Sequence, residues 1–78
     1  MKRDRFTRAE AEAKVGKTIK TRVDFSGVSK GTIGQVVKAD KMGKDEWDAV
    51  IRWDLPNERV PLDDWFTKDE YERFLEEL

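Results

Sequence analysis

The run WDAVIRWD at residues 47–54 alternates between apolar and polar side chains along most of its length. Successive side chains of an extended chain point to opposite faces, so one face of this run carries two tryptophans and an isoleucine. A helix would scatter the same residues around its circumference, because its period is about 3.6 residues. The run therefore predicts a β-strand with one buried face, and the fold must supply a sheet to hold it.

Two further runs share this period of two. TIKTRVDF at residues 18–25 and TIGQVVKA at residues 32–39 are rich in β-branched residues and are separated by a glycine-containing turn. Gly34, inside the second run, indicates a bulge or a sharp bend. A shorter run, RVPL at residues 59–62, contains Pro61, which restricts it to a sheet edge or a strand end. Short strands at this spacing are typical of a small barrel or sandwich.

Two similar motifs, FTRAEAE and FTKDEYE, predict helix starts on either side of these strands. Each places a threonine three residues before a glutamate, which is the pattern of a capping box. The first helix is expected at residues 7–15, with Gly16 just past its end. The second is expected at residues 67–78, and shared capping chemistry explains the likeness better than duplication. Its apolar face would consist of Tyr71, Phe74, Leu75 and Leu78.

The sequence thus predicts one domain that is mainly β with flanking helices. A frayed tail at residues 1–5 and the helix at 7–15 would precede a small β-barrel at 17–62, and the helix at 67–78 would follow it. The expected core consists of Ile19, Val23, Phe25, Ile33, Val37, Trp47, Ile51, Trp53, Leu62, Phe66, Phe74 and Leu75.

The composition restricts the chemistry available to these 78 residues. The chain has no cysteine and no histidine, so thiolate and imidazole ligands and nucleophiles are excluded. The acidic loop DKMGKDE at residues 40–46 does not match the spacing of a calcium-binding loop. We therefore expect no metal, no cofactor and no enzymatic activity. No apolar run approaches the roughly 20 residues of a membrane span, and no signal-peptide core follows the basic start, so a cytoplasmic location is the default expectation.

The pattern KGTIGQVV, followed by a turn and then WDAVIRW, resembles the G-x-x-G-x-V hairpin of SH3-like barrels. Such barrels occur in KOW and Tudor-type modules, in the nitrile hydratase β subunit and in the variable chain of ferredoxin–thioredoxin reductase. The resemblance covers residues 17–62. The segment DDWF at residues 63–66 resembles the one-turn 3₁₀ element that often precedes the last strand of these barrels, although here a predicted helix follows it.

The glycine-rich stretch FSGVSKGTIGQVV at residues 25–37 also suggests a phosphate-binding loop. Such a loop needs its lysine directly after the last glycine and a helix to supply backbone amides. Here Lys30 precedes Gly31, and the residues that follow are β-branched. We therefore interpret the stretch as a loop and a strand, in which Gly27 and Gly31 allow a positive φ.

The resemblance implies that a partner would bind in an aromatic-lined groove beside the first long loop. On that basis the candidate partner-binding residues are Phe25, Val28 and Lys30 from the loop and Trp65 from the boundary with the second helix. For Trp65, an equally good interpretation is a tryptophan that covers the edge of the core.

Charge is unevenly distributed along the chain. Residues 1–44 hold 12 Lys or Arg against five Asp or Glu, a balance of +7, and residues 45–78 hold four against 12, a balance of −8. Lys20, Arg22 and Lys30 would lie on or near the outer face of the first strand, where they could bind nucleic-acid phosphates. Mutual neutralisation of the two halves is the simpler interpretation.

We therefore expect a non-enzymatic protein-interaction module or small accessory subunit, with an unidentified protein as its partner. The alternative is an RNA- or DNA-binding barrel that uses Lys20, Arg22 and Lys30. The chain is expected to be a monomer or a weak dimer.

Overall fold

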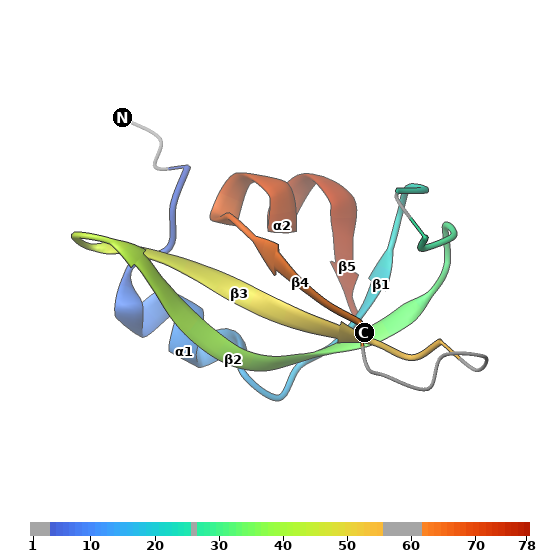
Figure 1. Ribbon diagram of the computed structural model, residues 1–78, viewed down its shortest axis with the longest axis horizontal. Coiled ribbons are helices and arrows are strands. Elements are labelled where there is room, and N and C mark those ends of the chain that lie inside the picture. Colours follow the sequence, from blue (N-terminus) through green and yellow to red (C-terminus); the bar gives the residue numbers. More distant parts are fainter. Residues whose placement is uncertain (1–3, 26, 56–61) are drawn as a thin grey trace.

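An antiparallel five-stranded sheet forms the body of the molecule, as the computed structural model in Figure 1 shows. The structure describes residues 4–25, 27–55 and 62–78. Its elements are α1 (Arg8–Lys14), β1 (Thr18–Thr21), β2 (Ile33–Gly43), β3 (Glu46–Trp53), β4 (Leu62–Phe66), α2 (Lys68–Phe74) and β5 (Leu75–Glu77). The strand order is β4-β3-β2-β1-β5. The mainly β prediction is confirmed, but the sheet is not closed, because no pairing joins β4 to β5 among the described residues.

The hairpin of β2 and β3 is the longest part of the sheet, and the two helices lie on either side of it in the view of Figure 1. Its register shifts between Val36 and Lys38 and between Lys41 and Gly43, so a bulge, one of the two alternatives predicted for Gly34, does not lie at that residue. Gly34 serves a different purpose. A Cβ at this position would lie 2.9 Å from side-chain carbons of both Ile51 and Trp53, so only glycine lets the two strands approach this closely.

The core lies on the inner face of the curved sheet. Of the predicted core residues, Ile19, Ile51, Trp53, Phe66 and Leu75 are buried. Residues of the predicted core that are half-buried and pack against it are Phe25, Trp47, Leu62 and Phe74.

The predicted inward face of β2 is wrong. Ile33 is 37% exposed and Val37 is half-buried, whereas Val36 is buried. The strand runs in the opposite phase because Gly34 packs against Ile51 and Trp53, which turns the neighbouring side chains outward.

The N-terminal segment is held against the sheet. Phe6 is buried, its carbonyl accepts a hydrogen bond from the Trp47 N–H at 3.1 Å, and its ring meets Tyr71 edge-on at 5.6 Å. The Asp4 carbonyl accepts the Asp69 N–H at 3.1 Å. The predicted frayed tail is therefore wrong for residues 4 and 5, and residues 1–3 lie outside the described part. Phe6, Ala11, Val28 and Tyr71 belong to the core although the predicted core omitted them.

The predicted helix at 67–78 is correct only to Phe74. From Leu75, which has φ −115° and ψ 152°, the chain becomes β5 and pairs antiparallel with β1. Without β5, β1 would be a sheet edge with unpaired backbone groups, and pairing satisfies them. Leu78 is consequently 65% exposed instead of completing a helical apolar face.

The segment at residues 63–66 also differs from its prediction. It belongs to strand β4, which pairs with β3, and it is not a 3₁₀ turn. Of the predicted short strand at 59–62, only Leu62 lies in the described part, where it begins β4. Among the described residues, no helix has the length and apolar character needed to cross a membrane.

Candidate functional site

A groove of about 470 Å³ lies between the loop after β1, strand β4 and helix α2. We call it the aromatic groove. Its lining residues are Val23, Asp24, Phe25, Asp64, Trp65, Phe66, Glu70 and Phe74. The loop, β4 and α2 are far apart in sequence, and the sheet and α2 bring them together.

The apolar part of the groove rests on the core. The Phe25 ring lies 5.4 Å from the Trp53 ring and 5.8 Å from the Phe66 ring, with the Phe66 contact edge-on. Phe25 and Val28 bond each other through both of their backbone N–H groups, at 2.9 and 2.7 Å. Gly27, with φ +77°, permits the tight turn between them. This turn fixes the position of Phe25.

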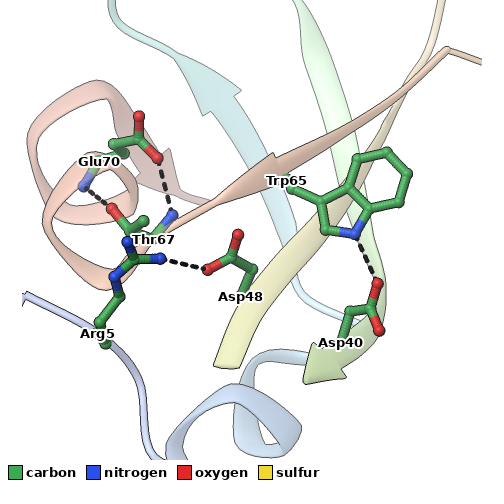
Figure 2. Close-up of polar contacts among 6 residues, drawn as sticks. All are labelled: Arg5, Asp40, Asp48, Trp65, Thr67 and Glu70. Atoms are coloured by element: carbon green, nitrogen blue, oxygen red, sulfur yellow. Dashed lines mark hydrogen bonds and ion pairs between the residues drawn. The ribbon is translucent and has the colours of Figure 1, made fainter. Parts of the chain in front are cut away.

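Three carboxylates border the groove, one from each of its three walls, and each has one oxygen held by an internal N–H group. Asp24 Oδ1 accepts the Lys30 backbone N–H at 2.6 Å, and Asp64 Oδ2 accepts the Trp53 indole N–H at 2.7 Å. Glu70 Oε1 accepts the Thr67 backbone N–H at 2.9 Å as part of the capping box, as Figure 2 shows. These bonds orient the three groups without neutralising them.

None of these three carboxylates forms an ion pair with a Lys or Arg in the described part of the chain. The groove is therefore an apolar surface bordered by uncompensated negative charge. Across the described ranges, no group of three or more acidic side chains is close enough to hold a metal ion, so the groove does not have the geometry of a metal site.

The predicted partner-binding residues are only partly brought together. Phe25 and Trp65 both border the aromatic groove. The Val28 side chain points from the loop into the core, where it is only 2% exposed, and it offers no contact surface to a partner. Lys30 is exposed, and its backbone N–H holds Asp24, but it does not line the groove.

Trp65 contributes less than its position suggests. Its indole N–H donates to Asp40 on β2 at 2.8 Å (Figure 2). The Lys38 ammonium lies 5.9 Å from its ring centroid. Asp64 and Phe66 contact Trp53 on the inner side of β4, and side chains alternate along a strand. The Trp65 ring therefore lies on the outer face, where it is 44% exposed and covers the sheet.

Sequence reasoning missed Asp24, Asp64, Glu70 and Phe74 as groove residues. The sequence predicted Glu70 as part of a helix cap and Phe74 as part of an apolar helix face. The residues around them gave no indication that α2 packs opposite the loop after β1. No local signal in the sequence marked Asp24 or Asp64 as a groove residue.

The predicted basic face of β1 is interrupted by acidic residues. Lys20 is paired in register with Glu76 of β5, and their charged atoms are 4.0 Å apart. Arg22 and Lys30 are exposed beyond the end of β1. Because β5 was predicted as part of a helix, its glutamates were not expected beside β1.

The two oppositely charged halves of the chain partly neutralise each other. Among the described residues, Arg5, Lys14 and Lys20 of the basic half pair with Asp48, Glu77 and Glu76 of the acidic half. Glu77 also accepts the Tyr71 hydroxyl at 2.8 Å, and the hydrogen bonds from Lys14 and Tyr71 lower the pKa of Glu77. These contacts support the simpler interpretation of the charge asymmetry.

Asp48 on β3 is the one acidic side chain of the described residues that is buried, at 5% exposure. Arg5 Nη1 lies 3.6 Å from its Oδ1 atom, too far for a hydrogen bond, so this oxygen has an ion-pair partner but no donor (Figure 2). Burial raises the pKa of Asp48, and the charge of Arg5 opposes that rise. Asp48 faces the N-terminal segment and does not line the groove.

A second hollow of about 410 Å³ lies where β2 and β3 meet, lined by Thr18, Ile33, Gly34, Gln35, Arg52, Trp53 and Asp54. The Arg52 guanidinium is already paired, because it donates two hydrogen bonds of 2.9 and 3.1 Å to the Asp63 carboxylate. The lining of this hollow mixes polar, charged and apolar residues. It does not bring together several carboxylates, several cations or several aromatic rings.

Comparisons of the chain with models of protein families, with curated proteins and with solved structures found no match. The aromatic groove and its charges are thus the basis for a functional inference.

Proposed function

We propose that the protein is a non-enzymatic interaction module that docks a partner protein in the aromatic groove. The observation that carries this proposal is the groove itself, in which an aromatic surface adjoins three carboxylates that have no ion-pair partner among the described residues. Exposed apolar surface with a polar border is the usual character of a docking site.

The strand arrangement supports an SH3-like barrel as the scaffold of this module. The antiparallel order β1-β2-β3 and the long β2–β3 hairpin support the resemblance drawn from residues 17–62, and the pairing of β5 with β1 extends the same sheet beyond those residues. The resemblance implies a groove beside the first long loop, and Phe25 of that loop lines the aromatic groove.

A protein partner is favoured over nucleic acid because of the charges near each surface. The aromatic groove carries Asp24, Asp64 and Glu70, which would repel phosphates. The basic face of β1 carries Glu76 beside Lys20. Neither surface offers the continuous positive charge that phosphate binding requires.

Affinity capture from the native cell tests the proposal. Tagged wild-type protein is compared with Phe74→Ala and Val23→Ala variants, which shorten two apolar groove residues, and with Met42→Ala, which shortens an exposed apolar side chain that does not line the groove. Each variant is first checked for folding by its amide spectrum. A partner that survives nuclease and is lost from either groove variant, but is retained by Met42→Ala, supports the proposal. Recovery of nucleic acid alone, or capture unchanged by both groove variants, overturns it.

A further inference from the structure

We propose that the aromatic groove takes an arginine side chain from an extended basic segment of the partner protein. This inference rests on the proposed docking function and names the chemistry of its ligand. The charges, the ring surfaces and the size of the groove support it.

The carboxylates of the groove have unused acceptor capacity. Asp24, Asp64 and Glu70 each give one oxygen to an internal N–H group, and the other oxygen accepts no hydrogen bond from the described residues. A carboxylate can accept about four hydrogen bonds, so each retains most of its capacity. Because the three groups come from three different elements, a cation in the groove meets negative charge from several directions. A ligand with positive charge complements this arrangement.

The groove also suits the apolar part of an arginine. Phe25, Phe66 and Phe74 provide ring surface along which an aliphatic stem can lie while its charged head reaches the carboxylates. The Phe74 ring already has one guanidinium near it, since Arg73, which does not line the groove, lies 5.2 Å from the ring centroid. Arg73 is itself paired with Asp69 at 3.2 Å, so its charge does not satisfy the groove carboxylates.

Arginine fits these features better than lysine. A planar guanidinium bonds a carboxylate through two N–H groups, stacks on aromatic rings and loses its water more readily than an ammonium group. The volume of about 470 Å³ lies toward the lower end of the range for ligand sites, roughly 300–1,000 Å³. The groove therefore admits one long side chain and its adjoining backbone, and the partner contributes an extended segment instead of a broad face.

The test is a titration of the full chain with the blocked peptide GSARLARSG, followed by amide chemical shifts. Three matched peptides replace both arginines with lysine, with norleucine or with glutamate. The arginine peptide is expected to shift amides at residues 23–25, 64–66 and 70–74, and to bind at least about tenfold more tightly than the norleucine peptide, with affinity falling as salt rises. The lysine peptide should bind more weakly than the arginine peptide, and the glutamate peptide should not bind.

Isosteric variants show whether the groove charges are responsible. Asp24→Asn, Asp64→Asn and Glu70→Gln each keep an oxygen that can accept the internal N–H bond while removing the charge. Each is expected to weaken arginine-peptide binding several-fold. Asp40→Asn is the matched control, because Asp40 also accepts a tryptophan N–H but lies on the outer face (Figure 2). Asp40→Asn should bind like the wild type.

Equal binding of the arginine and norleucine peptides would overturn the inference and leave the docking function standing. The absence of any groove shift up to about 1 mM peptide would also overturn it, while the capture experiment would still judge the docking function separately. Groove shifts that depend on protein concentration without peptide would identify a second copy of the chain as the occupant, which contradicts the proposal.

Discussion

The two helices of the chain begin in the same way. In α1, Thr7 and Glu10 exchange hydrogen bonds of 2.9 and 3.2 Å, and in α2, Thr67 and Glu70 exchange bonds of the same two lengths. A buried phenylalanine precedes each cap. Each phenylalanine also pairs with a residue of β3. Phe6 forms an isolated β-bridge with Trp47, and Phe66 of β4 is paired in register with Ala49. Similar local sequence has thus produced the same local structure twice.

The helices end differently. After α1, Gly16 has φ +93°, and the chain turns back into β1. After α2 there is no glycine, and Leu75 becomes extended at once because β5 pairs with β1. The capping residues therefore determine where each helix starts, whereas a long-range strand pairing determines where α2 ends.

The two helices also differ in the side chains that they present, and those of α2 line the groove. Glu10 of α1 is paired with Lys68 at 3.2 Å, but Glu70, at the equivalent position of α2, has no such pair among the described residues. Lys14 near the end of α1 corresponds to Phe74 near the end of α2. Helix α2 therefore presents an unpaired carboxylate and an aromatic ring where α1 presents neutralised charge.

The largest expected effect concerns the two phenylalanines before the caps. Phe6→Ala and Phe66→Ala should each lower the free energy of unfolding by about 3–5 kcal/mol, because both rings are buried and their loss leaves cavities. Urea denaturation measures both. Phe6→Leu and Phe66→Leu form a milder pair if the alanine variants do not fold. If Phe6→Ala lowered the free energy of unfolding much less than Phe66→Ala, the N-terminal segment would contribute less to core stability than β4 does.

The helix ends provide the next comparison. Gly16→Ala should lower stability by about 1–2 kcal/mol, because a Cβ is strained at φ +93° even though no atom lies within 4 Å of it. Gly43→Ala is a control at a glycine with ordinary φ, where the nearest atom to a Cβ would be the flexible end of Glu46 at 3.0 Å. Equal stability of Gly16→Ala and the wild type would contradict the role of Gly16 in ending α1.

The parts of the fold that the sequence predicted are those decided locally. The strand at Glu46–Trp53, both capping boxes and the positive φ of Gly27 and Gly31 depend on neighbouring residues. The prediction that this strand has one buried face is wrong, because Asp48 and Val50 on its other face are also buried. The inward phase of β2, the burial of Phe6 and the strand at Leu75 depend on partners distant in sequence. For the same reason, Phe25 was identified as a groove residue from its loop, whereas Glu70 and Phe74 required the fold.

The caps allow a direct test of equivalence. Thr7→Ala and Thr67→Ala should each cost about 1 kcal/mol, because each removes the acceptor of one helix N–H group. The two values are expected to agree within about 0.5 kcal/mol in denaturation experiments. Thr7→Ser and Thr67→Ser keep the hydroxyl and should restore most of the loss. A cost at one cap only would mean that tertiary contacts, rather than capping, hold the other helix.

The smallest expected effect is the contribution of Asp48 to the pH dependence of the free energy of unfolding. Asp48 lies on β3 between the two helix starts. The Arg5 charge on the α1 side lowers the pKa of Asp48, and the Glu70 charge on the α2 side raises it, but burial is the largest influence and the net pKa is raised above 3.8. The folded state therefore binds a proton more readily than the unfolded state. As the pH falls from 7 toward 4, the wild type should gain stability relative to Asp48→Asn, which cannot titrate.

Asp63→Asn is the matched variant with the opposite sign for this pH test. The hydrogen bonds from Arg52 lower the pKa of Asp63, so the wild type should lose stability relative to Asp63→Asn as the pH falls below the usual value of 3.8. Urea denaturation of the three proteins between pH 3 and 7 measures both differences, and the other carboxylates cancel because all three proteins contain them. If the wild type instead loses stability relative to Asp48→Asn as the pH falls, the positive charge of Arg5 outweighs the effect of burial on the pKa of Asp48.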